Sequence, residues 1–311
     1  MRPAVLALLL PLVLVAAGTV RDLNIKVLST MLTDNAGVGE WGFAALVEVD
    51  GRRILFDTDA RPQTVAANTA EMKIDLAGIT DVILSHNHGD HTGGLMTLRR
   101  NLMARDPKSL SVAHVGKGIF LARRSGAFAG NMAELKPAYE ATGGRFVEYD
   151  KPAEIFPGVW LTGPVPRRYP ERNWSGTGTI ETPQGTVEDN VPEDMSMVFR
   201  TAGGLVLLSG CGHAGIVNTL EYARETIQKA PVVAAVGGFH LFPLDDEKLQ
   251  WTAQKLKEFG LQNFLGAHCT GIEATYRIRQ LDGLGRKNAA VAAVGATFDL
   301  KNGLNPGAIS R

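Results

Sequence analysis

The chain has 311 residues, of which 45% are hydrophobic and 21% are charged. This length and composition indicate a globular protein with a sizeable core and exclude a disordered or fibrous chain. Lysine and arginine balance aspartate and glutamate at 32 each, so the charge gives no electrostatic reason to expect nucleic acid as a partner.

The N-terminus has the pattern of an export signal. Arg2 supplies a positive charge, residues 4–15 form an apolar run, and the small residues Ala16 and Ala17 follow. The run is too short for a comfortable membrane span. We expect residues 1–19 to be a cleaved signal peptide, and the mature protein to be periplasmic or extracellular with no stable membrane span. An uncleaved anchor or a buried first helix is the alternative.

The first half of the mature chain alternates strand-like and helical segments. Its expected strands are residues 24–32, 43–49, 53–56, 81–85 and 111–115. Its expected helices are residues 63–72, 93–103 and 132–142. Asp50-Gly51, between the second and third strands, is a strong hairpin signal.

The second half is also rich in strands. Its expected strands are residues 159–162, 195–200, 205–209, 232–236, 263–266 and 289–294. Its expected helices are residues 216–228, 245–259 and 272–281. Residues 169–193 read as a long loop, placed over a site, and we expect Glu193 and Asp194 to be solvated.

Four potential metal ligands, His86, His88, Asp90 and His91, lie within six residues directly after an apolar strand. Imidazole and carboxylate groups are ligands of zinc in proteins. Because the turn breaks the alternation of side chains, His86 and His88 can converge on one ion while Asp90 and His91 turn to another. We expect Gly89 to supply the backbone freedom for this reversal. A polar loop with solvated histidines is the alternative, which the density of ligand-type residues disfavours.

Further candidate ligands follow strands of the second half. His213 and His268 lie in glycine-flanked turns after apolar strands, a context that favours ligation over a core histidine. Cys211 can ligate as a thiolate or fill the pocket. An exported protein also permits a disulfide between Cys211 and Cys269, so ligation, lining and bridging stay open.

Two more residues follow strands near this set. His240, after Gly237-Gly238, can bind an ion, hold a substrate or cap its turn. Asp57 ends a strand, where it can orient a histidine from behind or form a turn.

The stretch from His86 to His91 resembles the H-x-H-x-D-H signature of the metallo-β-lactamase superfamily. Residues 40–43, 210–215, 237–241 and 268–271 resemble its dihydropterin-synthase-like branch more narrowly. The resemblance covers about residues 23–300. It implies one α+β domain over residues 20–311, a four-layer αββα sandwich of two mixed sheets with helices outside. It also implies two divalent metal ions between the sheets. The ligand types favour zinc, with iron or manganese as alternatives.

The resemblance assigns the ligands by position. His86, His88 and His213 match ligands of a first ion, Asp90 and His91 match ligands of a second, and His268 matches the last ligand.

The chain departs from the family pattern at three positions. Cys211 stands where many members have a metal-bridging aspartate, Asp59 where glycine is common, and Trp41 where this branch often has histidine. The cysteine at position 211 puts the bridging ligand and the affinity for the second ion in question. The residues at positions 59 and 41 put the substrate expected from the family in question. We place Glu40, beside Trp41, with His240 and Asp57 among residues that contact substrate or support the ligands.

These features predict a hydrolase of a small-molecule substrate, in which a metal-activated water attacks and Asp90 positions that water. A transferase that joins a dihydropterin to an aminobenzene-type partner is the second hypothesis, although export disfavours it because pterin intermediates are cytoplasmic. A β-lactamase, or a redox role of the two cysteines with iron, are further alternatives. The sequence specifies neither the substrate nor the oligomeric state.

Overall fold

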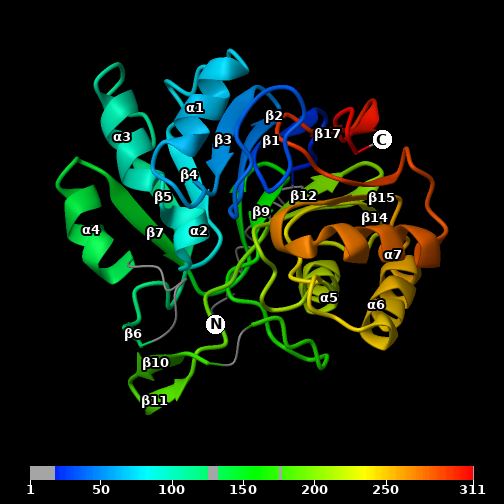
Figure 1. Ribbon diagram of the computed structural model, residues 1–311. Coiled ribbons are helices and arrows are strands. Elements are labelled where there is room, and N and C mark those ends of the chain that lie inside the picture. Colours follow the sequence, from blue (N-terminus) through cyan, green and yellow to red (C-terminus); the bar gives the residue numbers. More distant parts are fainter. Residues whose placement is uncertain (1–17, 125–131, 175–176, 311) are drawn as a thin grey trace, which may run out of the picture.

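The computed structural model describes residues 18–124, 132–174 and 177–310. The predicted signal peptide at residues 1–19 lies outside the described residues except for Gly18 and Thr19. Figure 1 shows two halves, each with helices on its outer side and strands toward the middle. Among the described residues, no helix is long and apolar enough to cross a membrane.

The first sheet has eight strands in the order β18-β17-β1-β2-β3-β4-β5-β7. They are β1 (Leu23–Ser29), β2 (Ala44–Val49), β3 (Arg52–Phe56), β4 (Asp81–Leu84), β5 (Val112–Gly116), β7 (Arg145–Tyr149), β17 (Thr297–Asp299) and β18 (Gly303–Asn305). Strands β3, β4, β5 and β7 run parallel, and the other neighbours are antiparallel. The outer face packs against α1 (Thr64–Glu71), α3 (Leu95–Met103) and α4 (Met132–Glu140).

The second sheet has seven strands in the order β16-β15-β14-β13-β12-β9-β8. They are β8 (Ala153–Phe156), β9 (Val159–Leu161), β12 (Met197–Thr201), β13 (Gly204–Ser209), β14 (Val232–Gly237), β15 (Asn263–Gly266) and β16 (Ala289–Val291). Strands β13 to β16 run parallel and the rest are antiparallel. Its outer face packs against α5 (Ile216–Thr226), α6 (Asp246–Glu258) and α7 (Ile272–Asp282).

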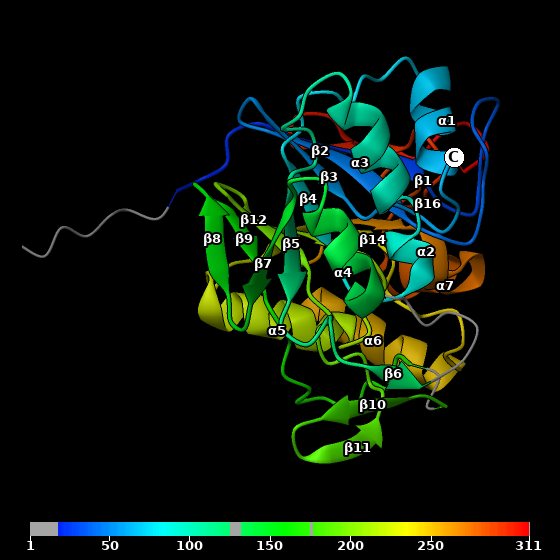
Figure 2. The same cartoon turned by 90° about the vertical axis from the view of Figure 1, so that its left-hand side faces the viewer.

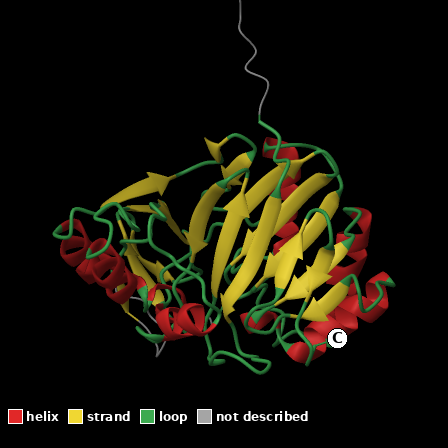
Figure 3. Cartoon of the chain, turned by 90° about the horizontal axis from the view of Figure 1, so that it is seen from above, coloured by secondary structure: helices red, strands yellow, loops and turns green. Residues whose placement is uncertain are grey.

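The two sheets share one apolar core. Alternate residues of β1 point inward, so Leu23, Ile25 and Val27 meet side chains such as Phe199 and Leu208 from the second sheet. Figure 3 shows the strands in the middle and the helices on both flanks. The predicted sandwich of two mixed sheets with helices outside is confirmed.

Residues 169–193 were expected to form a loop, and this expectation was wrong for residues 179–188. The segment contains β10 (Thr179–Thr182) and β11 (Gly185–Glu188), which pair with each other and with β6 (Arg123–Arg124) in a small third sheet. This sheet lies apart from the large ones in Figures 1 and 2. Strand β11 is exposed along its length, so it carries no apolar alternation that a sequence pattern could detect. The short strands β7, β8, β17 and β18 were also not predicted.

Arg99 in α3 is buried and hydrogen-bonds to the loops that follow α3 and α4. Its guanidinium donates to the carbonyl oxygens of Pro107 at 2.8 Å, Ser109 at 2.5 Å and Thr142 at 2.7 Å. Lysine keeps the charge but lacks the planar, five-donor fork, so buried carbonyl groups lose partners. We expect Arg99→Lys to lower the free energy of unfolding by about 3 kcal/mol, measured by urea denaturation. Arg100→Lys on the exposed face is the control, and equal losses in both variants would contradict this account.

Candidate metal centre

The predicted ligands meet where strands of both large sheets end. His86 follows β4 of the first sheet, and His88 leads into the short helix α2 (Gly89–Thr92). On the second sheet, His213 follows β13, while His268 begins a 3-10 turn after β15. The ends of parallel strands hold side chains on a rigid frame, which is the usual place for a site in such folds.

Three histidines form the first donor group, which we call the three-histidine group. The Nε2 atom of His86 lies 3.0 Å from Nδ1 of His88 and 3.2 Å from Nε2 of His213. A tetrahedral zinc ion with Zn–N bonds of about 2.0–2.1 Å needs nitrogens about 3.3 Å apart. Both distances are close to this value, and the rings of His88 and His213 lie 4.8 Å apart, so the three imidazoles can approach one ion.

Asp90, His91, His268 and Cys211 form a second donor group, which we call the mixed group. The Asp90 Oδ2 atom lies 3.3 Å from Nε2 of His268 and 3.8 Å from Nε2 of His91, and the Cys211 Sγ atom lies 3.1 Å from that His91 nitrogen. Asp90 Oδ1 is buried without a hydrogen-bond partner. Such orphaned atoms are rare in folded proteins and fit the role of metal ligands.

Cys211 lies between the two groups. Its Sγ atom is within 4.8 Å of the ligand atoms of His86 and His213, and also of those of His91 and His268. A thiolate here can reach either ion position. Imidazole, carboxylate and thiolate donors together make a set that zinc accepts, so the residues present fit the predicted metal.

Asp57 orients the ligands of both groups from behind. Its Oδ2 atom lies 2.7 Å from Nδ1 of His91 and accepts a hydrogen bond from Ser85 Oγ at 2.7 Å. Ser85 Oγ in turn lies 2.9 Å from Nδ1 of His86. Such carboxylate contacts fix the tautomer and the plane of a ligating imidazole. Asp57 is fully buried, and its φ of +54° places it in the left-handed region.

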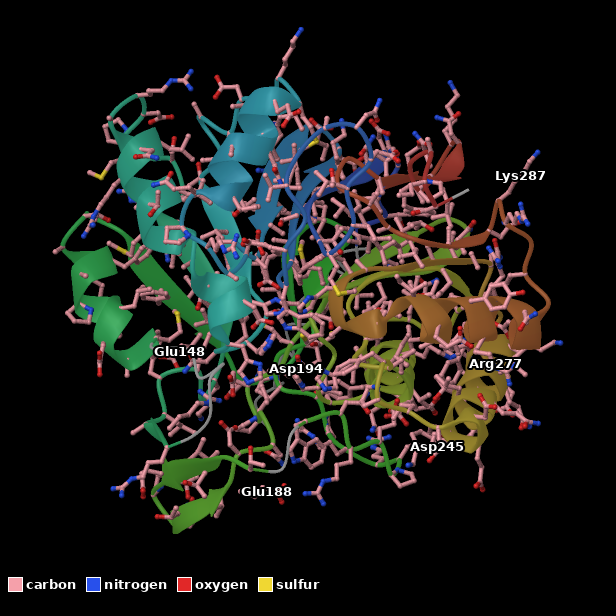
Figure 4. All side chains as sticks on the ribbon, in the orientation of Figure 1. Glu148, Glu188, Asp194, Asp245, Arg277 and Lys287 are labelled. Atoms are coloured by element: carbon pink, nitrogen blue, oxygen red, sulfur yellow. The ribbon has the colours of Figure 1, made fainter. Side chains whose placement is uncertain are left out.

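Glu193 and Asp194 are buried, so the expectation that they are solvated was wrong. Glu193 Oε1 accepts from the backbone N–H of Asn87 at 2.9 Å, and Asp194 Oδ2 accepts from the N–H of Ala214 at 3.0 Å. Figure 4 places Asp194 near the middle of the molecule, between the two halves. Each carboxylate therefore holds a loop that carries ligands. These partners come from distant segments, which a local sequence pattern does not reveal.

Two further contacts support this arrangement. The Nδ1 atom of His213 is hydrogen-bonded to the backbone carbonyl oxygen of Asn173. The Arg123 guanidinium donates to Asp189 at 2.8 Å and to Glu193 at 2.5 Å. Since Arg123 lies on β6 and Asp189 follows β11, the small third sheet is joined to the ligand-bearing loop at Asn87.

Burial and mutual crowding set the charges of the ligands. Burial, together with the neighbouring histidines, lowers the pKa of His86 and of His213, and burial lowers that of His88 to about 4. These imidazoles are therefore neutral near pH 7, as metal ligation requires. Burial opposes the charge on Asp90, but His91 and His268 outweigh it and hold the pKa of that carboxyl below its usual range.

The reversal after His88 does not depend on glycine, contrary to expectation. Gly89 has no left-handed backbone conformation, and a Cβ atom built there would meet nothing within 4 Å. The chain turns because α2 begins at this point, with His88 in an extended conformation before it. Asp90 and His91 lie within α2, so the second half of the motif is helical.

Aromatic side chains line the rim of the centre. The Trp41 ring lies 4.9 Å from the His268 ring and 5.6 Å from that of Phe242, which lies 5.1 Å from His240. Trp41 is 39% exposed and Phe242 is 51% exposed. His240 is half-buried, and its Nδ1 atom has no hydrogen-bond partner. Phe242 was not predicted, although it follows the Gly-Gly-x-His-Leu segment directly.

Glu40 belongs to a buried acid pair beneath this rim. Its Oε1 atom accepts from the backbone N–H of Arg61 at 2.8 Å, and its carboxyl group faces Asp59, which also accepts from Ser29. Burial, with the neighbouring Glu40, raises the pKa of Asp59 to about 7. A Cβ atom at Gly42 would lie 1.8 Å from Asp59 Oδ1, so the segment before Phe43 can approach Asp59 only with glycine there.

Comparisons with known proteins identify the family. A family model described as the β-lactamase superfamily domain matches residues 52–144. The 7,8-dihydropterin-6-methyl-4-(β-D-ribofuranosyl)-aminobenzene-5'-phosphate synthase of Methanocaldococcus jannaschii is 31% identical over 265 residues, which cover 81% of this chain and 89% of that protein. An uncharacterised protein of the same organism is 29% identical over 259 residues, covering 81% of this chain and 94% of its own.

Solved structures show the same fold. Tm1679, described as a metal-dependent hydrolase of the β-lactamase superfamily, is 29% identical with a TM-score of 0.72, covering 89% of this chain and 98% of its own. Zinc-bound PqqB from Methylobacterium extorquens matches at 15% identity and a TM-score of 0.53, covering 89% of this chain and all of its own. The second likeness is one of fold alone.

The role of Asp57 can be tested by its removal. We expect Asp57→Ala to weaken zinc binding by about 10- to 100-fold, because His91 and Ser85 lose the carboxylate that orients them. The measurement is the zinc affinity by competition with a chromophoric chelator. Asp81→Ala is the matched control, because Asp81 pairs with His114 at 2.8 Å away from the centre. A wild-type affinity in Asp57→Ala would refute the orienting role.

The buried acid pair predicts a pH dependence of stability. Because the folded pKa of Asp59 is about 7, above its ordinary value of 3.8, the native state keeps a proton that the unfolded state releases. Stability from this group therefore falls as the pH rises from about 4 to about 7. We expect Asp59→Asn to remove that fall. The free energy of unfolding of the variant minus that of the wild type should therefore increase from about pH 4 to about pH 7. Urea denaturation with a chelator present measures it; a constant difference at all pH values would contradict the prediction.

Proposed function

Because this chain belongs to the metallo-β-lactamase superfamily, in its dihydropterin-synthase-like branch, we propose that it is a hydrolase of a small-molecule substrate that uses two divalent metal ions, zinc in the first instance. The observation that carries the proposal is the pair of donor groups, with Cys211 within reach of both. The three-histidine group would hold one ion and the mixed group the other. Their donor types fit zinc.

The bound ions would lower the pKa of water toward about 7 and polarise the carbonyl or phosphoryl oxygen of the substrate. The side chains of the protein would orient the attacking water. Asp90 Oδ1 has no other partner and would hold the attacking water. The water oxygen bonds to the carbonyl carbon or phosphorus, the bond to the leaving group breaks, and the proton passes to that group.

The rim residues would define how substrate enters. His240 presents an unpartnered Nδ1 atom beside the exposed Phe242 ring, so it can hold a polar group of the substrate. The Trp41 and Phe242 rings offer apolar surface that would exclude water around the reacting bond. The description of Tm1679 as a metal-dependent hydrolase supports hydrolysis as the reaction class.

A second candidate function is transfer of a dihydropterin group to an aminobenzene-type partner. It is favoured by the 31% identity to the Methanocaldococcus jannaschii synthase over most of both chains. In this reaction the new bond forms to the partner, the bond to a diphosphate leaving group breaks, and the partner releases a proton. The same donor groups would stabilise the negative charge on the leaving diphosphate.

We further propose that the protein is exported and that the segment before about residue 20 is removed. The positive Arg2 and the apolar run after it support this. N-terminal sequencing of the protein from its native host tests the proposal, and an intact Met1 would contradict it.

The hydrolase proposal predicts that metal content and turnover are lost together. Zinc-loaded protein is assayed on a panel of esters, phosphodiesters and a β-lactam, and also on a dihydropterin diphosphate with an aminobenzene acceptor. We expect His86→Ala and Asp90→Ala to lose ions and to lower hydrolysis by more than about 100-fold, whereas Asp81→Asn keeps both. Undiminished hydrolysis in chelated protein would refute the proposal, and a coupled dihydropterin product without hydrolysis would select the second candidate.

A further inference from the structure

Three neighbouring parallel strands of the second sheet each deliver one soft or borderline donor to the same place. Cys211 follows β13, His240 follows β14, and Cys269 follows β15. The donor atoms of these three residues all lie within 4.8 Å of one another. Cys269 and His240 are in neither the three-histidine nor the mixed group.

The two sulfur atoms are in direct contact. Cys211 Sγ lies 3.1 Å from Cys269 Sγ, and both residues are free and buried. They are the only cysteines in the sequence. Two adjacent buried sulfur atoms form a pair of ligands suited to a thiophilic ion. The imidazole of His240 provides a third donor within 4.8 Å of both sulfurs.

The backbone around these donors is held in uncommon conformations. His240 has a φ of +47°, and His268, directly before Cys269, has a φ of +44°. Non-glycine residues adopt this left-handed region rarely, and such residues gather at functional sites. A Cβ atom at Gly238 would lie 3.1 Å from Cys269 Sγ and 1.9 Å from the carbonyl oxygen of Gly210. The end of β14 can therefore lie this close to Gly210 and Cys269 only with glycine at position 238.

We propose that Cys211, His240 and Cys269 form a thiolate-rich ion site beside the histidine centre, and that the Cys211 thiolate is shared with the ion of the mixed group. The shared ligation by Cys211 rests on the proposed function of the metal centre. The ion site itself needs only Cys211, His240 and Cys269, which all follow strands of the second sheet. Two thiolates and one imidazole select a thiophilic divalent ion such as zinc. Three protein ligands leave a position open on the side of the half-buried His240, where a sulfur- or nitrogen-bearing group of a substrate can bind.

The test uses cobalt as the probe, because cobalt bound by thiolates absorbs in the near ultraviolet. Reduced, metal-free protein is titrated with Co²⁺, and the bound ions are counted by native mass spectrometry. The wild type should bind three ions with a strong thiolate-to-cobalt band. Cys269→Ser should bind two ions and keep about half of the band, since Cys211 still ligates. His240→Ala should weaken the last ion and keep the band at saturation.

Ser209→Ala is the matched control, since Ser209 ends β13 two residues before Cys211 and its Oγ atom has no partner. It should behave as the wild type. His86→Ala separates this proposal from the hydrolase proposal, because it should lose an ion from the three-histidine group and keep the full thiolate band. The same ion count and band in Cys269→Ser as in the wild type would overturn the site. A disulfide between the two cysteines in protein isolated without oxidant would overturn it as well.

Discussion

The candidate metal centre depends on one buried carboxylate at the end of β3. Asp57 accepts from the backbone N–H of Ser85 at 2.8 Å and from its hydroxyl at 2.7 Å, and it contacts His91 at 2.7 Å. These contacts join the ends of two parallel strands and set the orientation of ligands on both sides. Since the charge is fully buried, it is stable only while these partners stay in place. The geometry of the centre and the integrity of the strand ends are therefore coupled.

The second sheet contributes the remaining ligands of both donor groups. His213 and Cys211 come from the end of β13, so the donors can meet only if the two sheets pack at a fixed distance across their shared core. Asp194 and Glu193 hold the two ligand-bearing loops by accepting hydrogen bonds from the backbone N–H groups of Ala214 and Asn87. A small sheet with little core of its own thus contributes to the site through the Arg123 ion pairs.

Sequence reasoning predicted the apolar strands and the ligand run, because both are local patterns. The apolar strand before His86 and the H-x-H-x-D-H spacing are visible within a dozen residues, and the resemblance supplied the four-layer fold. What it missed depends on tertiary contacts. Glu193 is buried because Asn87 and Arg123 reach it from distant segments, and β11 lacks an apolar face. Of the alternatives left open for the two cysteines, the structure shows free thiols in contact.

We propose that two ions lie between the sheets at the two donor groups. A crystal structure of zinc-loaded protein, with anomalous diffraction recorded at the zinc edge, measures this directly. We expect one peak among His86, His88 and His213, and another among Asp90, His91 and His268. An absence of peaks at these positions, with zinc bound elsewhere or not at all, would contradict it.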